Sequence, residues 1–122
     1  MKVLIADDSA IVRERIIAML SEIKEVRIVG EAQNADETVE LTLKLEPDVV
    51  ILDIRMPGNG ISVLPKIKDS KNAPIVIMFT NYPYEQYEKK CMEAGAEYFF
   101  DKSVGIKEVI KILNQLISDF KK

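Results

Sequence analysis

The chain has 122 residues, which is enough for one domain with a single core and too few for two, so we expect one domain over residues 1–122. Hydrophobic residues make up 48% and charged residues 30%, so the chain is globular rather than disordered, and its formal net charge of −3 argues against direct DNA binding. The sequence contains no histidine, which excludes Ser-His-Asp and Cys-His catalysis, histidine-ligated zinc and a phosphohistidine carrier.

Short apolar runs alternate with helical patterns in the first half of the chain. Strands are expected at residues 3–6, 26–29 and 49–52. Helices are expected at about residues 10–22, after Asn34, and at residues 61–68. Asp8 or Ser9 is a suitable cap for the first helix, and Asn34 with Glu37 resembles a capping box for the second, which Pro47 ends.

The same alternation continues in the second half. Strands are expected at residues 75–79 and 98–100, with a helix at about residues 84–94 that Gly95 terminates. The final helix has apolar residues at helical spacing along one face, namely Ile106, Val109, Ile110, Leu113, Leu116, Ile117 and Phe120. Five strand–helix units predict an α/β fold, a doubly wound sandwich with a five-stranded parallel sheet.

Polar side chains follow four of the five predicted strands, namely Asp7, Asp8, Asp53, Thr80 and Lys102. The carboxyl ends of parallel strands open onto one edge of a sheet, so these residues should converge there. Three carboxylates repel one another unless a divalent cation or a proton relieves them, and a hydroxyl and an ammonium can hold an anionic group. The set predicts a magnesium-dependent phosphoryl site centred on one aspartate.

Taken singly, each position has an ordinary explanation. A lysine or threonine at a strand end is usually a solvated loop residue, and a pair of aspartates is often a helix cap.

The single cysteine, Cys91, lies in an apolar setting typical of a core residue. No apolar run reaches the ~18 residues of a membrane span and the N-terminus is not that of a signal peptide, so we expect a cytoplasmic protein.

The order of these motifs resembles that of response-regulator receiver domains of two-component signalling, and the resemblance runs from end to end. The family pattern is an acidic pair after the first strand, an aspartate followed three and four residues later by Met-Pro, and a hydroxyl after the fourth strand. Here these are Asp7-Asp8, Asp53 with Met56-Pro57, and Thr80; Gly95-Ala96 then precedes Lys102 by seven and six residues. The resemblance implies a flavodoxin-like (βα)5 fold with strand order 2-1-3-4-5.

The resemblance also implies a role for each site residue. Asp53 would be the phosphoacceptor, and Mg²⁺, for which Mn²⁺ could substitute, would be held by Asp7, Asp8, Asp53 and the backbone carbonyl of Arg55. Thr80 and Lys102 would contact the phosphoryl group, and Phe99, three residues before the lysine, would be the switch aromatic. The phosphoryl donor would be a sensor histidine kinase or a phosphotransfer protein. Phosphorylation would change the affinity for a downstream protein target or drive dimerisation, without turnover of an external substrate or contact with a membrane.

Three departures from the family pattern stand out. Ser103 replaces the proline that usually follows the lysine, which removes a cis-proline joint and predicts a more mobile loop. The loop that begins at Gly58 is one residue shorter than the common form. Asn81 and Tyr82 follow Thr80 where a small residue is common, and with Arg55 they border the path of a hydrolytic water, so we expect them to set the acyl phosphate lifetime.

Two further alternatives concern surface and class. Tyr82, Tyr84 and Tyr87 are either partly buried against a neighbouring helix or part of a docking face. A haloacid-dehalogenase-type phosphohydrolase would need an acid where Arg55 stands, and a flavin binder would need a glycine-rich loop after the first strand. A pseudo-receiver that only docks would not need the intact acidic site.

Overall fold

The computed structural model describes residues 1–82 and 84–120. Its strands are β1 (Lys2–Ala6), β2 (Arg27–Ala32), β3 (Val49–Leu52), β4 (Ile75–Thr80) and β5 (Tyr98–Asp101). Its helices are α1 (Ala10–Leu20), α2 (Ala35–Leu45), α3 (Gly60–Lys68), α4 (Glu85–Glu93) and α5 (Lys107–Phe120), with a 3-10 turn, η1, at Lys102–Val104.

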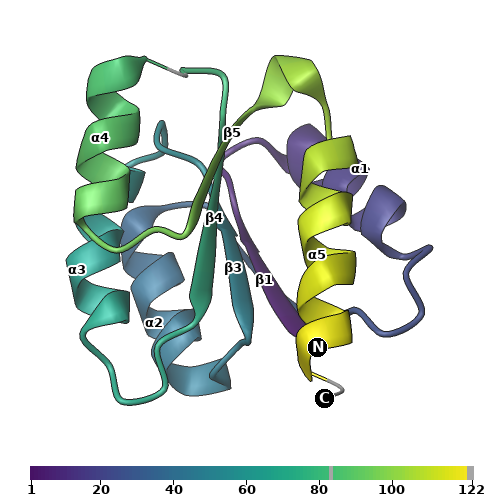
Figure 1. Ribbon diagram of the computed structural model, residues 1–122. Helices are drawn as coiled ribbons and strands as arrows, with labels where there is room; N and C mark the ends of the chain where they lie inside the picture. The colour runs from purple at the N-terminus through teal and green to yellow at the C-terminus, as the bar shows by residue number, and fades with distance from the viewer. Residues whose placement is uncertain (83, 121–122) are drawn as a thin grey trace.

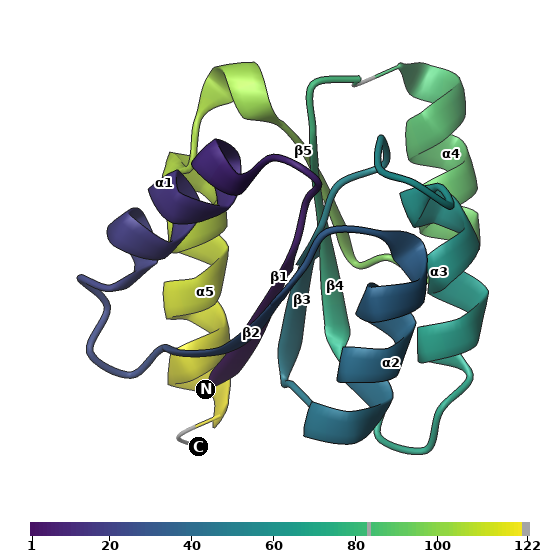
Figure 2. The ribbon, with the colours of Figure 1, turned by 180° about the vertical axis from the view of Figure 1, so that it is seen from behind.

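The five strands form one parallel sheet in the order β2-β1-β3-β4-β5, which confirms the predicted fold class and strand order. Helices α1 and α5 cover one face of the sheet, and α2, α3 and α4 cover the other (Figures 1 and 2). Within the described residues, no helix combines the length and the apolar composition that crossing a membrane requires.

The central strand β3 explains the two-sided core. All four of its side chains are buried, and successive residues point to opposite faces, as the pleat requires. Val50 and Leu52 pack in the cluster on the side of α3, together with Val63, whereas Val49 and Ile51 pack in the cluster that includes residues of α1 and α5. The uninterrupted apolar runs in the sequence therefore reflect burial on both faces.

Helix starts follow the predicted caps. The Ser9 hydroxyl accepts a hydrogen bond from the Val12 amide at 3.2 Å, so Ser9 rather than Asp8 caps α1. The Asn34 side chain accepts from the Glu37 amide at 2.8 Å, as a capping box requires. The return bond differs from the expected form, because the Glu37 carboxylate accepts from the Gln33 amide, at 3.0 Å.

Two expected features differ in the structure. β2 spans Arg27–Ala32 rather than residues 26–29, because Gly30–Ala32 continue the pairing with β1 beyond a shift in register. Phe120 was expected on the buried face of α5, but its side chain is 55% exposed at the last residue of the helix. The other α5 residues that pack in the core, including Leu113 and Leu116, lie further from the helix end.

Candidate functional site

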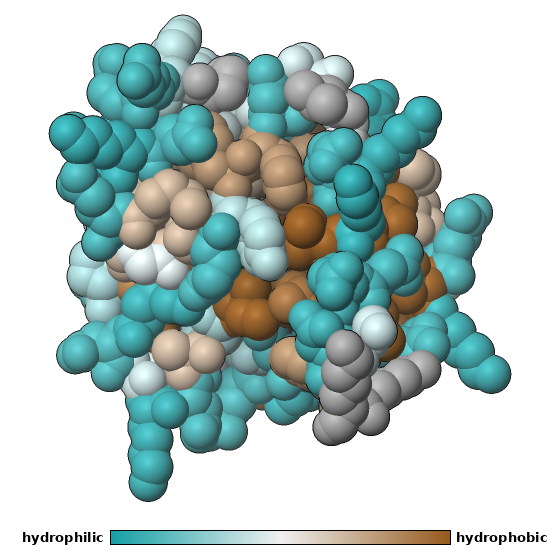
Figure 3. Space-filling view, viewed as in Figure 1, coloured by the Kyte–Doolittle hydropathy of each residue, from teal (hydrophilic) through white to brown (hydrophobic). Residues whose placement is uncertain are grey.

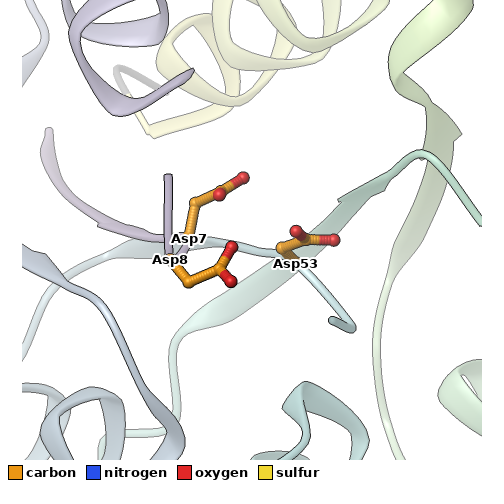
Figure 4. Close-up of side chains that lie close together, drawn as sticks. All are labelled: Asp7, Asp8 and Asp53. Atoms are coloured by element: carbon orange, nitrogen blue, oxygen red, sulfur yellow. The ribbon is translucent and has the colours of Figure 1, made fainter. Parts of the chain in front are cut away.

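Asp7, Asp8 and Asp53 lie together at the carboxyl ends of β1 and β3 (Figure 4). One carboxylate oxygen from each lies within 4.8 Å of the others. Asp7 is 2% exposed and Asp53 5% exposed, whereas Asp8 is open to solvent. The structure thus brings together the three acids that the strand-end pattern predicted, with one side of the cluster accessible.

The sheet fixes the backbone of both buried acids. The Asp53 amide donates to the Ala6 carbonyl at 2.9 Å, and the Asp7 amide donates to the Ala32 carbonyl at 3.0 Å. Each side chain also binds a nearby amide through one oxygen: Asp7 Oδ1 accepts from Ser9 at 2.9 Å, and Asp53 Oδ1 accepts from Ile54 at 2.8 Å. The second oxygen of each carboxylate is left to face the site.

Lys102 supplies the positive charge in the cluster. Its Nζ donates to Asp7 Oδ2 at 2.6 Å and to Asp53 Oδ2 at 3.1 Å, and its side chain is 11% exposed. Lys102 opens η1, where the Asp101 carboxylate accepts from the Ser103 amide at 2.8 Å. All described peptide bonds are trans, and a capped 3-10 turn thus replaces the usual proline joint. The greater mobility expected of this loop stays a prediction.

The buried charges shift each other's protonation. Burial raises the pKa of Asp53, and the charge of Asp7 raises it further, while Lys102 and a hydrogen bond from Thr80 act in the opposite direction. The pKa of Lys102 is raised as well: burial would lower it, but its hydrogen bond to Asp7 and the charges of Asp53 and Asp7 outweigh that effect. The site is therefore an ammonium held between acids, with one acid that resists ionisation.

Thr80 ends β4 with its side chain fully buried beside Asp53. Its hydroxyl oxygen accepts a hydrogen bond from the Tyr82 amide at 3.1 Å. The hydroxyl therefore contacts both the acidic cluster and the segment that leads to α4.

Arg55 and Tyr82, which the sequence associated with the acyl phosphate lifetime, are in contact. The guanidinium carbon of Arg55 lies 4.4 Å from the centre of the Tyr82 ring, within the range of a cation–π interaction.

Asn81 is exposed and lines a cavity of about 540 Å³ beside Lys102. The Tyr82 ring is followed by Tyr84 at 6.4 Å and then Tyr87 at 5.5 Å from Tyr84, so the three tyrosines form one cluster. Tyr84 is 53% exposed and Tyr87 is half-buried.

Phe99 lies on β5 opposite Met78 of β4 and is half-buried against the core cluster on the α3 side. Its neighbours Tyr98 and Phe100 point to the other face and stack on each other, with ring centres 6.2 Å apart. The structure gives Phe99 packing contacts, and its role as a moving switch stays a prediction.

The loop after Asp53 contains a requirement that the sequence did not reveal. A Cβ on Gly60 would lie 1.9 Å from the backbone oxygen of Asp53, so only glycine allows the start of α3 to approach the end of β3 this closely. The Gly60 amide donates to the Ile54 carbonyl at 2.8 Å, and Asn59 adopts a positive φ of 67°. A glycine just before an apolar helical run was the signal available in the sequence.

The donor set fits a hard divalent cation. Mg²⁺ prefers oxygen ligands and usually binds through one or two carboxylates together with water. The three aspartates supply such oxygens at one point, and the exposure of Asp8 leaves access for water. The part expected of the Arg55 backbone carbonyl stays a prediction.

Comparison with known proteins shows that the chain is similar to response regulators and to their receiver domains. A family model described as the response regulator receiver domain matches residues 3–114. The chain is 31% identical over 118 residues to the response regulator GacA of Pseudomonas aeruginosa, covering 96% of the chain and 55% of that protein. It is 42% identical over 106 residues to protein-glutamate methylesterase/protein-glutamine glutaminase 4 of Hahella chejuensis, covering 84% of the chain and 27% of that protein. The chain thus spans about half or less of the length of these relatives.

Solved structures show the same likeness. The response regulator domain of Thermotoga maritima CheB has a TM-score of 0.84 and 30% identity, with 98% of this chain and 94% of that chain covered. The isolated REC domain of RcsB from Salmonella enterica serovar Typhimurium, in the presence of phosphomimetic BeF3-, has a TM-score of 0.87 and 28% identity, with 97% and 88% covered.

Proposed function

Because the chain belongs to the family of response regulator receiver domains of two-component systems, we propose that it is a phosphoacceptor switch that receives a phosphoryl group on Asp53. The observation that supports this most directly is the pair of contacts made by Lys102, which reaches both Asp53 and Asp7 from the far end of the chain. A sensor histidine kinase or a phosphotransfer protein would supply the phosphoryl group.

The proposed transfer needs little covalent chemistry from the protein. An oxygen of the Asp53 carboxylate forms a bond to phosphorus while the bond from phosphorus to the donor's imidazole nitrogen breaks, and the electron pair of that bond stays on the imidazole. Lys102 and Thr80 hold phosphoryl oxygens as charge moves, which is the positioning and electrostatic stabilisation on which phosphoryl transfer depends. Turnover of an external substrate has no part in this proposal.

Asp7, Asp8, Asp53 and the Arg55 carbonyl would hold Mg²⁺, or Mn²⁺ in its place. When bound, the cation neutralises the phosphoryl oxygens so that an anionic carboxylate can approach them. The same charge would relieve the repulsion between Asp53 and Asp7, which adds to the effect of burial in raising the pKa of Asp53.

The output would be a change in affinity for a protein partner in the cytoplasm. The Tyr82–Tyr84–Tyr87 cluster is our candidate for the docking face, because aromatic residues are enriched at interfaces and Tyr84 is 53% exposed. Phosphorylation-dependent dimerisation is the alternative readout. Partner binding that is equal for wild type and for Tyr84→Ala with Tyr87→Ala would exclude this face.

The direct test is labelling by a small phosphodonor. Wild-type protein incubated with Mg²⁺ and acetyl phosphate should gain one phosphoryl group by intact mass, and Asp53→Asn should gain none. Asp101→Asn, which removes another strand-end acid that lies outside the cluster, is the matched control and should be labelled normally. An adduct that persists in Asp53→Asn would show that the acceptor is a different residue.

A further inference from the structure

Arg13 on α1 links the acidic end of β1 to the edge strand β2. Its Nη1 donates to the backbone carbonyl of Asp7 at 2.6 Å, and its Nε donates to the Glu31 carboxylate at 3.0 Å. The Arg13 side chain is 14% exposed and that of Glu31 is 45% exposed. The guanidinium therefore joins three elements, although it touches none of the three clustered carboxylates.

The contact to the Asp7 carbonyl bears on two of the three acids. A trans peptide is planar, so holding the Asp7 carbonyl fixes the plane between Asp7 and Asp8. The Asp7 amide is already bound to Ala32, and Asp7 Oδ1 accepts from the Ser9 amide. Together with these bonds, the contact from Arg13 fixes the orientation of the peptide that joins Asp7 to Asp8.

The position of Arg13 is not explained by helix stability. It lies four residues after the cap Ser9, near the helix end where the macrodipole disfavours a cation, and the first turn of α1 contains no acid. The guanidinium must instead be held by its two acceptors. Its fork geometry suits this, because two nitrogens can donate to two different oxygens at once.

We propose that Arg13 is a positioning residue for the cation site: by holding the Asp7 carbonyl, it sets the orientation of the Asp7 and Asp8 carboxylates toward Asp53. This rests on the proposed function, since it concerns the divalent cation expected there. The edge strand β2 then contributes to the site indirectly, through Glu31, although it places no side chain in the cluster.

The two possible roles of Arg13, as a positioning residue or as a positive charge alone, predict opposite effects of its removal on cation binding. If Arg13 acted only through its positive charge, removing it would strengthen the attraction of the acids for a cation. If it positions the acids, removing it should weaken cation binding, as loss of a residue that orients metal ligands typically costs about 10-fold in affinity or more. The sign of the change therefore separates the two roles.

The experiment is calorimetric titration with Mg²⁺ of the wild type, Arg13→Ala, Arg13→Lys and Arg15→Ala. We expect Arg13→Ala to bind Mg²⁺ about 10-fold more weakly than wild type. Arg13→Lys keeps the charge but lacks the fork, and it should also bind more weakly than wild type. Arg15→Ala removes the same charge from the same helix, at an exposed residue whose side chain makes no hydrogen bond or ion pair to any described residue, and it should not weaken binding.

Metal-free thermal unfolding of each variant shows whether the fold is retained. Arg13→Ala that binds Mg²⁺ as tightly as wild type, or more tightly, overturns the proposal. If Arg13→Ala does not fold, Arg13→Lys decides: weaker binding supports positioning and unchanged binding overturns it. Wild type that binds no Mg²⁺, or Asp8→Asn that binds as wild type does, would instead contradict the cation site itself.

Discussion

Asp53 is held in conditions that oppose its own ionisation. Asp53 is 5% exposed, it lies near Asp7, and the Lys102 ammonium is shared between the two acids. Burial raises its pKa in spite of that ammonium. A carboxyl group placed in this way should cost stability in the metal-free protein wherever it is ionised.

The first prediction concerns this cost. Because the folded-state pKa of Asp53 is raised above its ordinary value of 3.8, its contribution to stability is fully present below that value and is lost as the pH rises through the folded-state pKa. Without Mg²⁺, Asp53→Asn should therefore be more stable than wild type at pH 7, by about 1 kcal/mol, the size of a typical single substitution.

The measurement is urea unfolding of both proteins between pH 4 and pH 8 in the presence of a chelator. The advantage of Asp53→Asn should shrink toward pH 4, where the wild-type carboxyl takes up its proton. An advantage that is constant with pH would mean that the buried charge of Asp53 is not its source.

The second prediction concerns the contact between Arg55 and Tyr82. The guanidinium carbon lies 4.4 Å from the ring centre. We predict that this pair borders the path of a hydrolytic water to Asp53. Arg55→Ala and Tyr82→Ala should each shorten the lifetime of the acyl phosphate about fivefold, which corresponds to about 1 kcal/mol in the barrier.

The double variant should lose little more than either single variant, because each substitution already breaks the contact. Tyr84→Ala, which leaves the Arg55–Tyr82 pair intact, is the control. Phosphate release after removal of the phosphodonor measures the rate. Equal rates in wild type and in both single variants would remove this role.

The strand-end pattern predicted that Asp7, Asp8, Asp53 and Lys102 would converge, and the structure brings them together. Their roles stay predictions. The pattern did not predict the hydrogen bond from Arg13 to the backbone carbonyl of Asp7. A carbonyl is present in every residue, so such a contact leaves no pattern in the sequence. It also missed the Lys68–Glu97 ion pair, which joins the end of α3 to the residue before β5.

At the scale of the elements, several hydrogen bonds hold the connection from β3 to α3 next to the site. The Ala35 amide donates to the Pro57 carbonyl at 2.8 Å, and the Asn59 amide donates to Met56 at the same distance. Asn59 caps α3 by accepting from the Ile61 amide at 2.8 Å. The short loop is thus fixed by backbone bonds within itself and to the start of α2.

The third prediction follows from the Gly60 contact. Gly60→Ala would place a methyl group 1.9 Å from the Asp53 carbonyl oxygen, so the backbone itself must shift. We expect a loss of about 3 kcal/mol in the free energy of unfolding, at the upper end of overpacking effects.

Gly30→Ala is the control, because its added Cβ would meet only the ends of leucine side chains, the nearest at 3.1 Å, and the loss should be about 1 kcal/mol. Urea unfolding compares the two variants. Similar losses for both would show that the approach of α3 to Asp53 is not tight.

Strand and helix boundaries show where local pattern reasoning reaches its limit. β3 and β4 were predicted within one residue, because strands covered on both faces are continuously apolar. β2 was misplaced, because its register shift and its exposed Arg27 and Glu31 interrupt any simple pattern. An edge strand has one neighbour and a partly open face, so packing constrains its sequence less.

The molecule as a whole has its polar chemistry at the carboxyl ends of the central strands and apolar packing below it. The two core clusters meet only through the sheet, which separates the α1 and α5 side from the other three helices (Figure 1). The face with β5 and α5 in view has apolar side chains in its middle, surrounded by hydrophilic ones (Figure 3).

The fourth prediction is stabilisation of the whole domain by ligands of the site. Mg²⁺ with beryllofluoride, a phosphoryl mimic, should bind the folded state alone and raise the free energy of unfolding by about 2.7 kcal/mol at a concentration 100 times its dissociation constant. Scanning calorimetry with and without the ligands measures this. Asp53→Asn should show little of the beryllofluoride effect, and an equal effect in both proteins would place the mimic elsewhere.

The hydrogen bond between the Thr80 hydroxyl and the Tyr82 amide has a mechanical consequence. If the hydroxyl turns inward to meet a phosphoryl oxygen, the amide must either follow it or lose its acceptor. Following it pulls on the polypeptide just ahead of α4, and with it on the ring that stacks against Arg55 and leads to Tyr84. Phosphorylation of Asp53 would then change the position of Tyr82 and Tyr84 through the backbone between Thr80 and Tyr82. This coupling would not depend on any motion of Phe99.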